Sequence, residues 1–460
     1  MFVIFSIFYT FQNEDSERFK HVFAIMKRAG FTKVAYNNSD DWSVMWAHDY
    51  PFDQIKPVMK KLKSYQKVNK QPGSGFVTEK VYLSASESPF IPKSFIIPKD
   101  TEKLTSYAEE YPNTMFVQKN SNHGGIKIEK LDKLDLKSSG SFVQVYLDNP
   151  FLIDGYKFDI GVYTVVTSID PLRIYVFDGD VLIRFCPEQY HPFDPSNKDK
   201  YVVGDNYRPT WKVPTLAKLY SDLGYTFKQT LNAHINSLGK TPETVWDQIH
   251  EIIRETYISK EKLMAIGASY YPYPRNFFEM VRFDFVLDAD LKVYLMEANM
   301  SPNLSSKTFP KNRLLYEQVV YNVLRLVGVA RGGMYGHNLQ SLSNEEQEMQ
   351  VSDKDLAVYA DECSSAQCSQ PNSCNKVLCR LCSQCITSEE KGFLRMAYLE
   401  HVNRHACKRI YPESVMKNKN SHSFTEEIIR NQLSDKLSIN NAKMHQWFIG
   451  KCAQSNTWCE

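Results

Sequence analysis

One stretch of the sequence, residues 279–304, constrains the fold more than any other. It reads EMVRFDFVLDADLKVYLMEANMSPNL. Apolar and polar residues alternate from Met280 to Leu287 and again from Val293 to Asn299, and the polar run Asp288 to Lys292 separates the two. Two alternating runs joined by a short polar segment are typical of a β-hairpin. The sequence therefore predicts a sheet that includes this hairpin.

The hairpin also gathers oxygen-bearing side chains. Glu297 and Asn299 share one face of their strand, and a register centred just past Asp290 brings Asp284 level with Glu297. Two carboxylates and an amide on rigid strands suit a hard cation, and Mg²⁺ held in this way commonly bridges protein carboxylates to substrate phosphates. We therefore predict Asp284, Glu297 and Asn299 as metal ligands. The alternative is a solvent-facing hairpin with ordinary acidic residues.

Two segments of the chain resemble the tubulin tyrosine ligase-like proteins, which are ATP-grasp amino-acid ligases. FDFVLDADLKVYLMEANMSPNL is similar to the metal-binding hairpin of that family. The run from Phe142 to Arg184 resembles the family's adenine hinge and its KFD strand, here YKFDIGVYTVV. The resemblance covers roughly residues 42–329. It implies an α+β fold of the ATP-grasp type with N-terminal, central and C-terminal lobes, followed by a Cys-rich C-terminal module.

We expect four parts along the chain. They are an N-terminal α/β lobe (1–75), the ATP-grasp central and C-terminal lobes (76–329), a polar linker (330–360) and a Cys-rich, helical C-terminal region (361–460). The apolar start MFVIFSIFYTF favours a first strand, with a truncated signal anchor as the alternative. No stretch has the roughly 20 apolar residues that a membrane helix needs, so no membrane span is expected.

The resemblance implies a nucleotide site for ATP. Its nucleotide-binding residues would be Lys80, Lys119, Gly125, Ile126, Gln144, Val145, Tyr146, Leu147, Lys157 and Asp159. In this scheme Lys119 contacts a phosphate, and backbone N–H groups of the glycine loop 120–126 close over it. Residues 144–147 surround the adenine. Lys157 and Asp159 point to one face of their strand, where they suit phosphate and ribose or substrate contacts.

Catalytic roles are implied in the same way. Lys157 would bind the phosphates and Arg184 would stabilise the transition-state charge, while Lys307 would contact the amino-acid substrate. Gly161 stands where the family has arginine in KFD-x-R. Loss of such a contact to an acyl-phosphate-like transition state typically costs on the order of 3 kcal/mol. If the site lacks only that arginine, Gly161→Arg is expected to raise activity.

The implied activity is ligation of an amino acid, glutamate first, to a tubulin tail through an acyl phosphate made with ATP and Mg²⁺. The lysine-rich run Lys56 to Lys70 would dock the acidic tails of tubulin or a microtubule, with a free amino acid as the other substrate. A net charge of +2 predicts no general attraction to nucleic acid. Such a ligase would work in the cytoplasm, at microtubules or cilia. One alternative is a degenerate ATP-grasp domain that binds nucleotide or tubulin without ligating; another is a ligase for a non-tubulin protein.

Cysteines concentrate near the C-terminus. Six of the ten lie close together, namely Cys363, Cys368, Cys374, Cys379, Cys382 and Cys385. Their C-x2-C-x2-C core is compatible with a structural Zn²⁺, whose site needs four closely spaced thiolates or imidazoles. The same six would equally form three disulfides in an oxidising compartment. The disulfide alternative would place the chain in the lumen of the secretory pathway.

Overall fold

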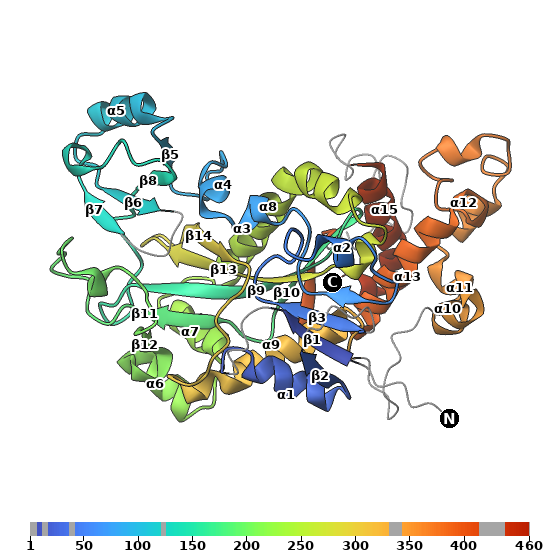
Figure 1. The fold of residues 1–460 in the computed structure, drawn as a ribbon, viewed down its shortest axis with the longest axis horizontal. Coiled ribbons are helices and arrows are strands. Elements are labelled where there is room, and N and C mark those ends of the chain that lie inside the picture. The colour runs from blue at the N-terminus through green and yellow to red at the C-terminus, as the bar shows by residue number, and fades with distance from the viewer. Residues whose placement is uncertain are drawn as a thin grey trace.

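The computed structural model describes residues 7–11, 17–35, 42–120, 126–330, 343–413 and 438–459. It is a mixed α and β protein whose strands form three sheets (Figure 1). The N-terminal sheet is parallel in the order β2-β1-β3-β4. Its strands are β1 (Ile7–Phe11), β2 (Thr32–Ala35), β3 (Val44–Ala47) and β4 (Lys67–Val68), and α1 (Lys20–Arg28) connects the first two. The expected first strand is thus confirmed over Ile7–Phe11.

The second sheet, which we call the central sheet, is antiparallel in the order β5-β8-β6-β7. Its strands are β5 (Ser94–Ile97), β6 (Phe116–Asn120), β7 (Lys127–Glu129) and β8 (Ser141–Val145), and α5 (Thr101–Glu110) covers one face. Leu104 of α5 packs with Phe95, Phe116 and Val143 in a small core of its own. The short helices α2 (Lys56–Met59), α3 (Gly75–Thr78) and α4 (Lys80–Ser84) precede this sheet in the chain.

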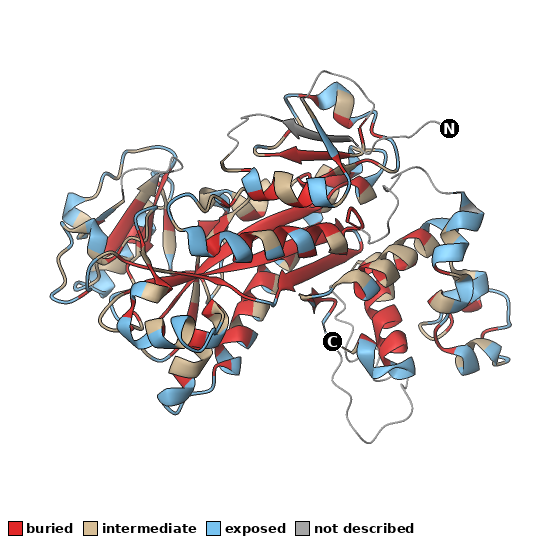
Figure 2. Ribbon diagram, turned by 90° about the horizontal axis from the view of Figure 1, so that it is seen from below, coloured by how far each residue is buried: buried red, intermediate tan, exposed pale blue. Residues whose placement is uncertain are grey.

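The main sheet has seven strands and β9 at its centre. They are β9 (Phe158–Ile169), β10 (Leu172–Phe177), β11 (Leu182–Phe185), β12 (Arg208–Pro209), β13 (Glu279–Leu287), β14 (Val293–Asn299) and β15 (Cys407–Tyr411). Strands β10 and β11 pair along one side of β9, and β13 pairs along the other. Every residue of β9 and β13 is buried, which suits strands covered on both faces (Figure 2).

Helices cover the main sheet on both faces. They are α6 (Pro214–Ser221), α7 (Phe227–Ser237), α8 (Glu243–Ser269) and α9 (Arg313–Leu326). The long helix α8 lies on one face of the sheet, and α9 lies on the other beside α1 (Figure 1). Apolar residues of the sheet and of these helices form one continuous core.

The C-terminal region, expected as a linker followed by a Cys-rich, helical part, is mainly helical in the described residues. Its helices are α10 (Asn344–Gln350), α11 (Asp353–Leu356), α12 (Ala360–Ser364), α13 (Ser388–Asn403) and α15 (Ile439–Gln454). Val351 and Leu356, inside the expected linker, are buried against Trp447 of α15. Strand β15 then joins the edge of the main sheet beside β10. Residues 343–358 of the expected linker thus pack against the C-terminal helices, while residues 331–342 lie outside the described part of the chain.

One buried ion pair fixes α13 to the main sheet. Glu400 accepts hydrogen bonds from Nε and Nη2 of Arg173, at 2.8 and 3.0 Å, and also from Thr167 and Tyr175. Arg173 has no exposed surface and Glu400 is 4% exposed. A buried arginine needs such a partner, because an unpaired charge out of water is costly. None of the described helices is long and apolar enough to cross a membrane.

Candidate functional site

A cavity of about 620 Å³ lies where the three sheets meet. Strands β6 and β8 of the central sheet form one wall, and β9, β11, β13 and β14 of the main sheet form the other. Arg18 and His48 of the N-terminal part complete it, together with the loops around residues 201–205 and 301–303. A cavity of this size and mixed polarity is suited to a ligand of nucleotide dimensions.

The hairpin β13–β14 brings the three predicted metal ligands to this cavity. Asp284 lies opposite Glu297 in the antiparallel pair, as the sequence predicts, and both line the cavity with Asn299. The Nδ2 amide of Asn299 donates to Asp284 Oδ2 at 2.8 Å, which leaves its carbonyl oxygen for a cation. The described residues hold no group of three His, Cys, Asp or Glu side chains able to bind a metal. The hairpin's oxygen donors still fit Mg²⁺, which usually takes its remaining ligands from phosphate and water.

Most of the predicted nucleotide-binding residues also line the cavity. They are Lys119, Ile126, Gln144, Val145, Tyr146, Leu147, Lys157 and Asp159, and Arg184, predicted as a catalytic residue, lines the cavity too. Lys80 is not among the lining residues. Its Nζ, however, lies 3.4 Å from Oε1 of Glu297, and Glu297 does line the cavity. Gly125 falls outside the described residues, and Lys307 is exposed away from the cavity.

Two carboxylates and two arginines form a buried charged quartet at the hairpin end of the cavity. Arg184 donates two hydrogen bonds to Asp159, at 3.0 and 2.7 Å, and one to Asp284 at 3.1 Å. Arg282 donates two to Asp284, at 2.7 and 2.9 Å. Burial raises the pKa of Asp159 to about 6, despite Arg184. Burial acts on Asp284 too, but Arg282 and Arg184 hold its pKa below the ordinary value.

Arg282 is a member of this quartet that the sequence analysis missed. It lines the cavity, and its side chain passes over the Cα of Gly161 on the neighbouring strand. A Cβ built on Gly161 would lie 2.8 Å from Cδ of Arg282, closer than real Cβ contacts come. The expectation that Gly161→Arg alone raises activity therefore overlooked the side chain already in that place. An arginine two residues before Asp284, in an otherwise apolar strand, was the available signal.

Lys119, in β6, and Lys157, which directly precedes β9, both enter the cavity. Nζ of Lys119 donates to Oε1 of Gln144 at 2.9 Å, and burial lowers the pKa of Lys119 to about 8. Burial also lowers the pKa of Lys157, whose Nζ lies 5.2 Å from the centre of the Tyr146 ring. The Gln144 amide donates to Pro92 and Ser94, so this side chain orients Lys119 and fastens β5.

For the ATP site expected from the sequence, the lowered pKa of Lys119 predicts how binding would depend on pH. Phosphates bind the protonated amine, and the amine loses its proton as the pH rises through about 8. ATP affinity should therefore fall by up to about tenfold between about pH 8 and pH 9. Isothermal titration at several pH values measures this fall. Lys119→Arg should remove it, since a guanidinium keeps its charge; an unchanged slope in that variant would place the titration elsewhere.

The lysine-rich run Lys56 to Lys70 is only partly an exposed face. Lys56, Lys60, Lys61 and Lys63 are exposed. Lys67 donates to the carbonyl of Arg275, and Lys70 is fully buried. Nζ of Lys70 donates to the carbonyl of Met300 and to Ser301, both at 2.7 Å, and burial lowers its pKa to about 8. Lys70 thus anchors the segment after β14 instead of facing a partner, contrary to the expectation for the whole run.

The clustered cysteines are paired as disulfides, which is the second of the two alternatives. The bonds join Cys363 to Cys382, Cys368 to Cys379 and Cys374 to Cys385. A fourth, Cys452 to Cys459, fastens the end of α15. Cys186 and Cys407 are free and buried.

This pairing predicts a thiol count. Protein purified without reductant and then unfolded should react with two equivalents of a thiol reagent, because eight of the ten cysteines are in disulfides. A spectrophotometric titration in guanidinium chloride measures it, with fully reduced protein as the control. Ten reactive thiols, with zinc released on unfolding, would support the metal alternative.

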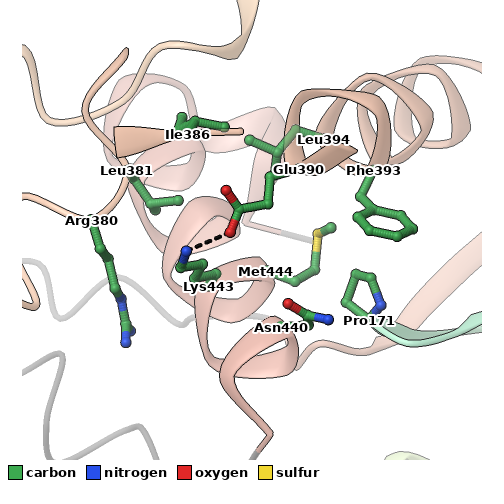
Figure 3. Close-up of a pocket in the computed structure, with 10 residues that line it drawn as sticks. All are labelled: Pro171, Arg380, Leu381, Ile386, Glu390, Phe393, Leu394, Asn440, Lys443 and Met444. Atoms are coloured by element: carbon green, nitrogen blue, oxygen red, sulfur yellow. Dashed lines mark hydrogen bonds and ion pairs between the residues drawn. The ribbon is translucent and has the colours of Figure 1, made fainter. Parts of the chain in front are cut away.

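A second, much smaller cavity lies within the C-terminal region. It holds about 20 Å³ between α13, α15 and Pro171 in the turn that joins β9 to β10 (Figure 3). Phe393, Leu394 and Met444 line it, and an ion pair joins Glu390 of α13 to Lys443 of α15. Such a space holds about one water molecule, so it is a packing gap. It shows how closely the C-terminal helices pack on the β9–β10 turn.

Comparison with known proteins bears on this site. The model of the tubulin-tyrosine ligase family matches residues 58–332. A Caenorhabditis elegans protein named as a probable tubulin polyglutamylase is 39% identical over 98% of this chain and 85% of its own length. A Homo sapiens tubulin monoglutamylase is 28% identical over 78% of this chain and 29% of that protein. A Mus musculus tubulin polyglutamylase is 30% identical over 62% of this chain and 37% of that protein.

Proposed function

Because the chain belongs to the tubulin-tyrosine ligase family, we propose that it is an ATP- and Mg²⁺-dependent ligase that adds an amino acid, most readily glutamate, to a carboxylate of a tubulin tail. The observation that carries the proposal is the cavity in which the hairpin carboxylates and the buried lysines converge. The printed names of the relatives, tubulin polyglutamylases and a monoglutamylase, support glutamate as the amino acid and tubulin as its acceptor.

The arrangement of sheets supports an ATP-grasp fold. We assign the N-terminal sheet, the central sheet and the main sheet to its three lobes, with the nucleotide between the second and third. In this assignment the adenine lies against residues 144–147, which are the last two residues of β8 and the two that follow it. The main sheet carries the reacting groups. The position of the cavity between two sheets suits a ligand that both lobes grip.

Seven of the cavity-lining residues are assigned a role in the proposed reaction. Lys119 and Lys157 bind the phosphates of ATP, and Arg184, held by Asp159, faces the charge that develops during transfer. Asp284, Glu297 and Asn299 would hold Mg²⁺, which when bound would neutralise phosphate charge and orient the terminal phosphate. In this assignment the groups that bind anions come from several parts of the cavity wall, and the ligands of the cation come from the hairpin.

The proposed chemistry has two steps. A carboxylate oxygen of the acceptor protein attacks the terminal phosphorus of ATP, ADP leaves, and an acyl phosphate forms. The amine of free glutamate then attacks the acyl carbon, inorganic phosphate leaves, and the amine gives up a proton as the amide forms. The exposed lysines Lys56, Lys60, Lys61 and Lys63 are proposed to attract the acidic tail.

Intact-mass spectrometry of tubulin tests this proposal. Tubulin is incubated with the full chain, ATP, Mg²⁺ and one of glutamate, glycine or tyrosine. Mass steps of one glutamate residue, absent without ATP, are the expected result. Steps with glycine or tyrosine would reassign the amino acid. Absence of any step, with ATP binding intact, would favour a non-catalytic nucleotide- or tubulin-binding domain or a ligase that acts on another protein.

The disulfides favour a second candidate, a ligase that modifies a protein other than tubulin in the secretory pathway. Disulfides persist in oxidising compartments and are rare in the cytosol, and four lie in this chain. Protease protection of the tagged full chain in isolated microsomes separates the two candidates. Protection that detergent abolishes would support the luminal ligase, and digestion without detergent would support the cytoplasmic one.

A further inference from the structure

We propose that Arg282 binds the phosphoryl group that the ligase transfers, and that Gly161 is glycine because the Arg282 side chain needs its space. This inference rests on the proposed function, since it assigns a residue to the phosphate end of the same cavity. It gives a role to the one arginine of the quartet that neither the sequence motifs nor the resemblance pointed to.

The first support is the orientation of the guanidinium. Arg282 is 6% exposed and lines the cavity from β13. Asp284 accepts from its Nε at 2.7 Å and from its Nη2 at 2.9 Å. This paired contact fixes the plane of the guanidinium, and toward the described residues Arg282 donates from Nε and Nη2, which leaves Nη1 for a ligand. A planar, permanently charged group with a spare donor is well suited to phosphate.

The second support is the glycine on the adjacent strand. Gly161 lies opposite Asp284 in the pairing of β9 with β13, in the middle of a buried strand. Its φ is not positive, so the backbone does not require glycine. Glycine in a strand interior is unfavourable and commonly marks a close approach by another group. Here the closest group is Arg282, with Cδ at 2.8 Å and Nε at 3.2 Å from the position of an added Cβ, and Oδ1 of Asp284, which Arg282 holds, also lies at 3.2 Å.

The third support is the use already made of Arg184. Both of its paired donors go to Asp159, and Nη2 also reaches Asp284. Arg184 is therefore held mainly by the carboxylate of Asp159, at the β11 side of the cavity. Arg282 adds a second guanidinium on the hairpin, beside the oxygen donors proposed for Mg²⁺. A transferred phosphate between the two would meet the arginines of β11 and β13, and also Lys119 of β6 and Lys157 just before β9.

The geometry allows one arginine at this place, supplied by either strand. Gly161→Arg should clash with Arg282 and lose activity, in contrast to the gain expected from the sequence. Arg282→Gly should lose activity because the guanidinium that would bind the phosphoryl group is gone. The double variant Gly161→Arg, Arg282→Gly moves the arginine to β9 and should recover at least about a tenth of the wild-type rate, whereas each single variant falls by about a hundredfold or more.

A binding measurement tests Arg282 even if no ligation is found. The affinities of the full chain for ATP and ADP are compared by calorimetry with Mg²⁺ present, and thermal melting checks the fold. Arg282→Gly should reduce the preference for ATP over ADP at least about tenfold, and the double variant should restore it. Arg282→Lys keeps a positive charge beside Asp284 but loses the paired donors of the guanidinium. Its melting temperature should be near that of the wild type, and its preference for ATP over ADP should be intermediate.

Three results would overturn the proposal. They are an unchanged ATP-to-ADP preference in folded Arg282→Gly or Arg282→Lys, a folded double variant that recovers neither preference nor rate, and a wild-type chain without any preference for ATP. If the wild type prefers ATP but ligates no amino acid, the proposed function fails. The ATP-to-ADP preference of the Arg282 variants would still decide whether Arg282 binds the phosphoryl group.

Discussion

Glu297→Gln should reduce amino-acid ligation by at least about a hundredfold and leave the chain folded, because a cation bound at the hairpin supplies several kcal/mol of transition-state stabilisation. Glu297 lines the cavity opposite Asp284, and it lies outside the paired contacts of the quartet. Glutamine keeps its size and removes only the charge. Rates of glutamate incorporation into tubulin, followed by mass spectrometry, measure the loss, and thermal melting verifies the fold.

A matched control for this change lies on the same hairpin. Asp290 is exposed in the turn between β13 and β14 and is not among the cavity-lining residues. Asp290→Asn removes the same charge from the hairpin and should leave the rate within about twofold, because surface changes away from a site have small effects. A Glu297→Gln protein as active as the control would refute the proposed metal site.

Glu400→Ala should lower the free energy of unfolding by about 3–5 kcal/mol, since it leaves Arg173 charged and unpaired inside the protein. Glu400 accepts hydrogen bonds from Arg173, Thr167 and Tyr175, all on the main sheet. The carboxylate belongs to α13, so the loss should loosen the C-terminal region from the sheet. Urea unfolding followed by circular dichroism measures the change.

Two further variants separate the charge from the packing at this position. Arg173→Met combined with Glu400→Leu should regain most of the stability, because an apolar pair of similar volume avoids the unpaired charge. Glu389→Ala changes an exposed residue at the start of the same helix and should cost less than about 1 kcal/mol. If Glu400→Ala were no more harmful than Glu389→Ala, α13 would not depend on this ion pair.

The sequence predicted the hairpin well because its signal is local. The period-two alternation and the polar turn fix β13 and β14, and the register that sets Asp284 opposite Glu297 follows from them. The predicted residues Lys119 and Lys157 lie in β6 and directly before β9, and both line the cavity together with the hairpin residues.

What the sequence could not provide depends on contacts between distant residues. The place of Arg282 over Gly161 follows from the pairing of β9 with β13, which no local pattern reveals. Burial of Lys70 follows from the packing of the residues after β4 on the segment after β14. The cysteine spacing left disulfides and zinc equally open, because six cysteines allow fifteen pairings and spacing does not choose among them. Strand β15 was missed for the same reason, since its partner β10 lies far earlier in the chain.

The strand that completes the main sheet is also the last of its strands to be synthesised. As the chain leaves the ribosome, β9, β10 and the whole hairpin emerge long before residues 407–411, and the edge of β10 stays open to pairing with other chains. A premature stop codon just after the family-matched region, residues 58–332, would therefore encode every proposed ligase residue on an unfinished sheet. Such an allele should behave in genetics as a null with aggregated product, whereas a self-contained enzyme domain would leave residual activity.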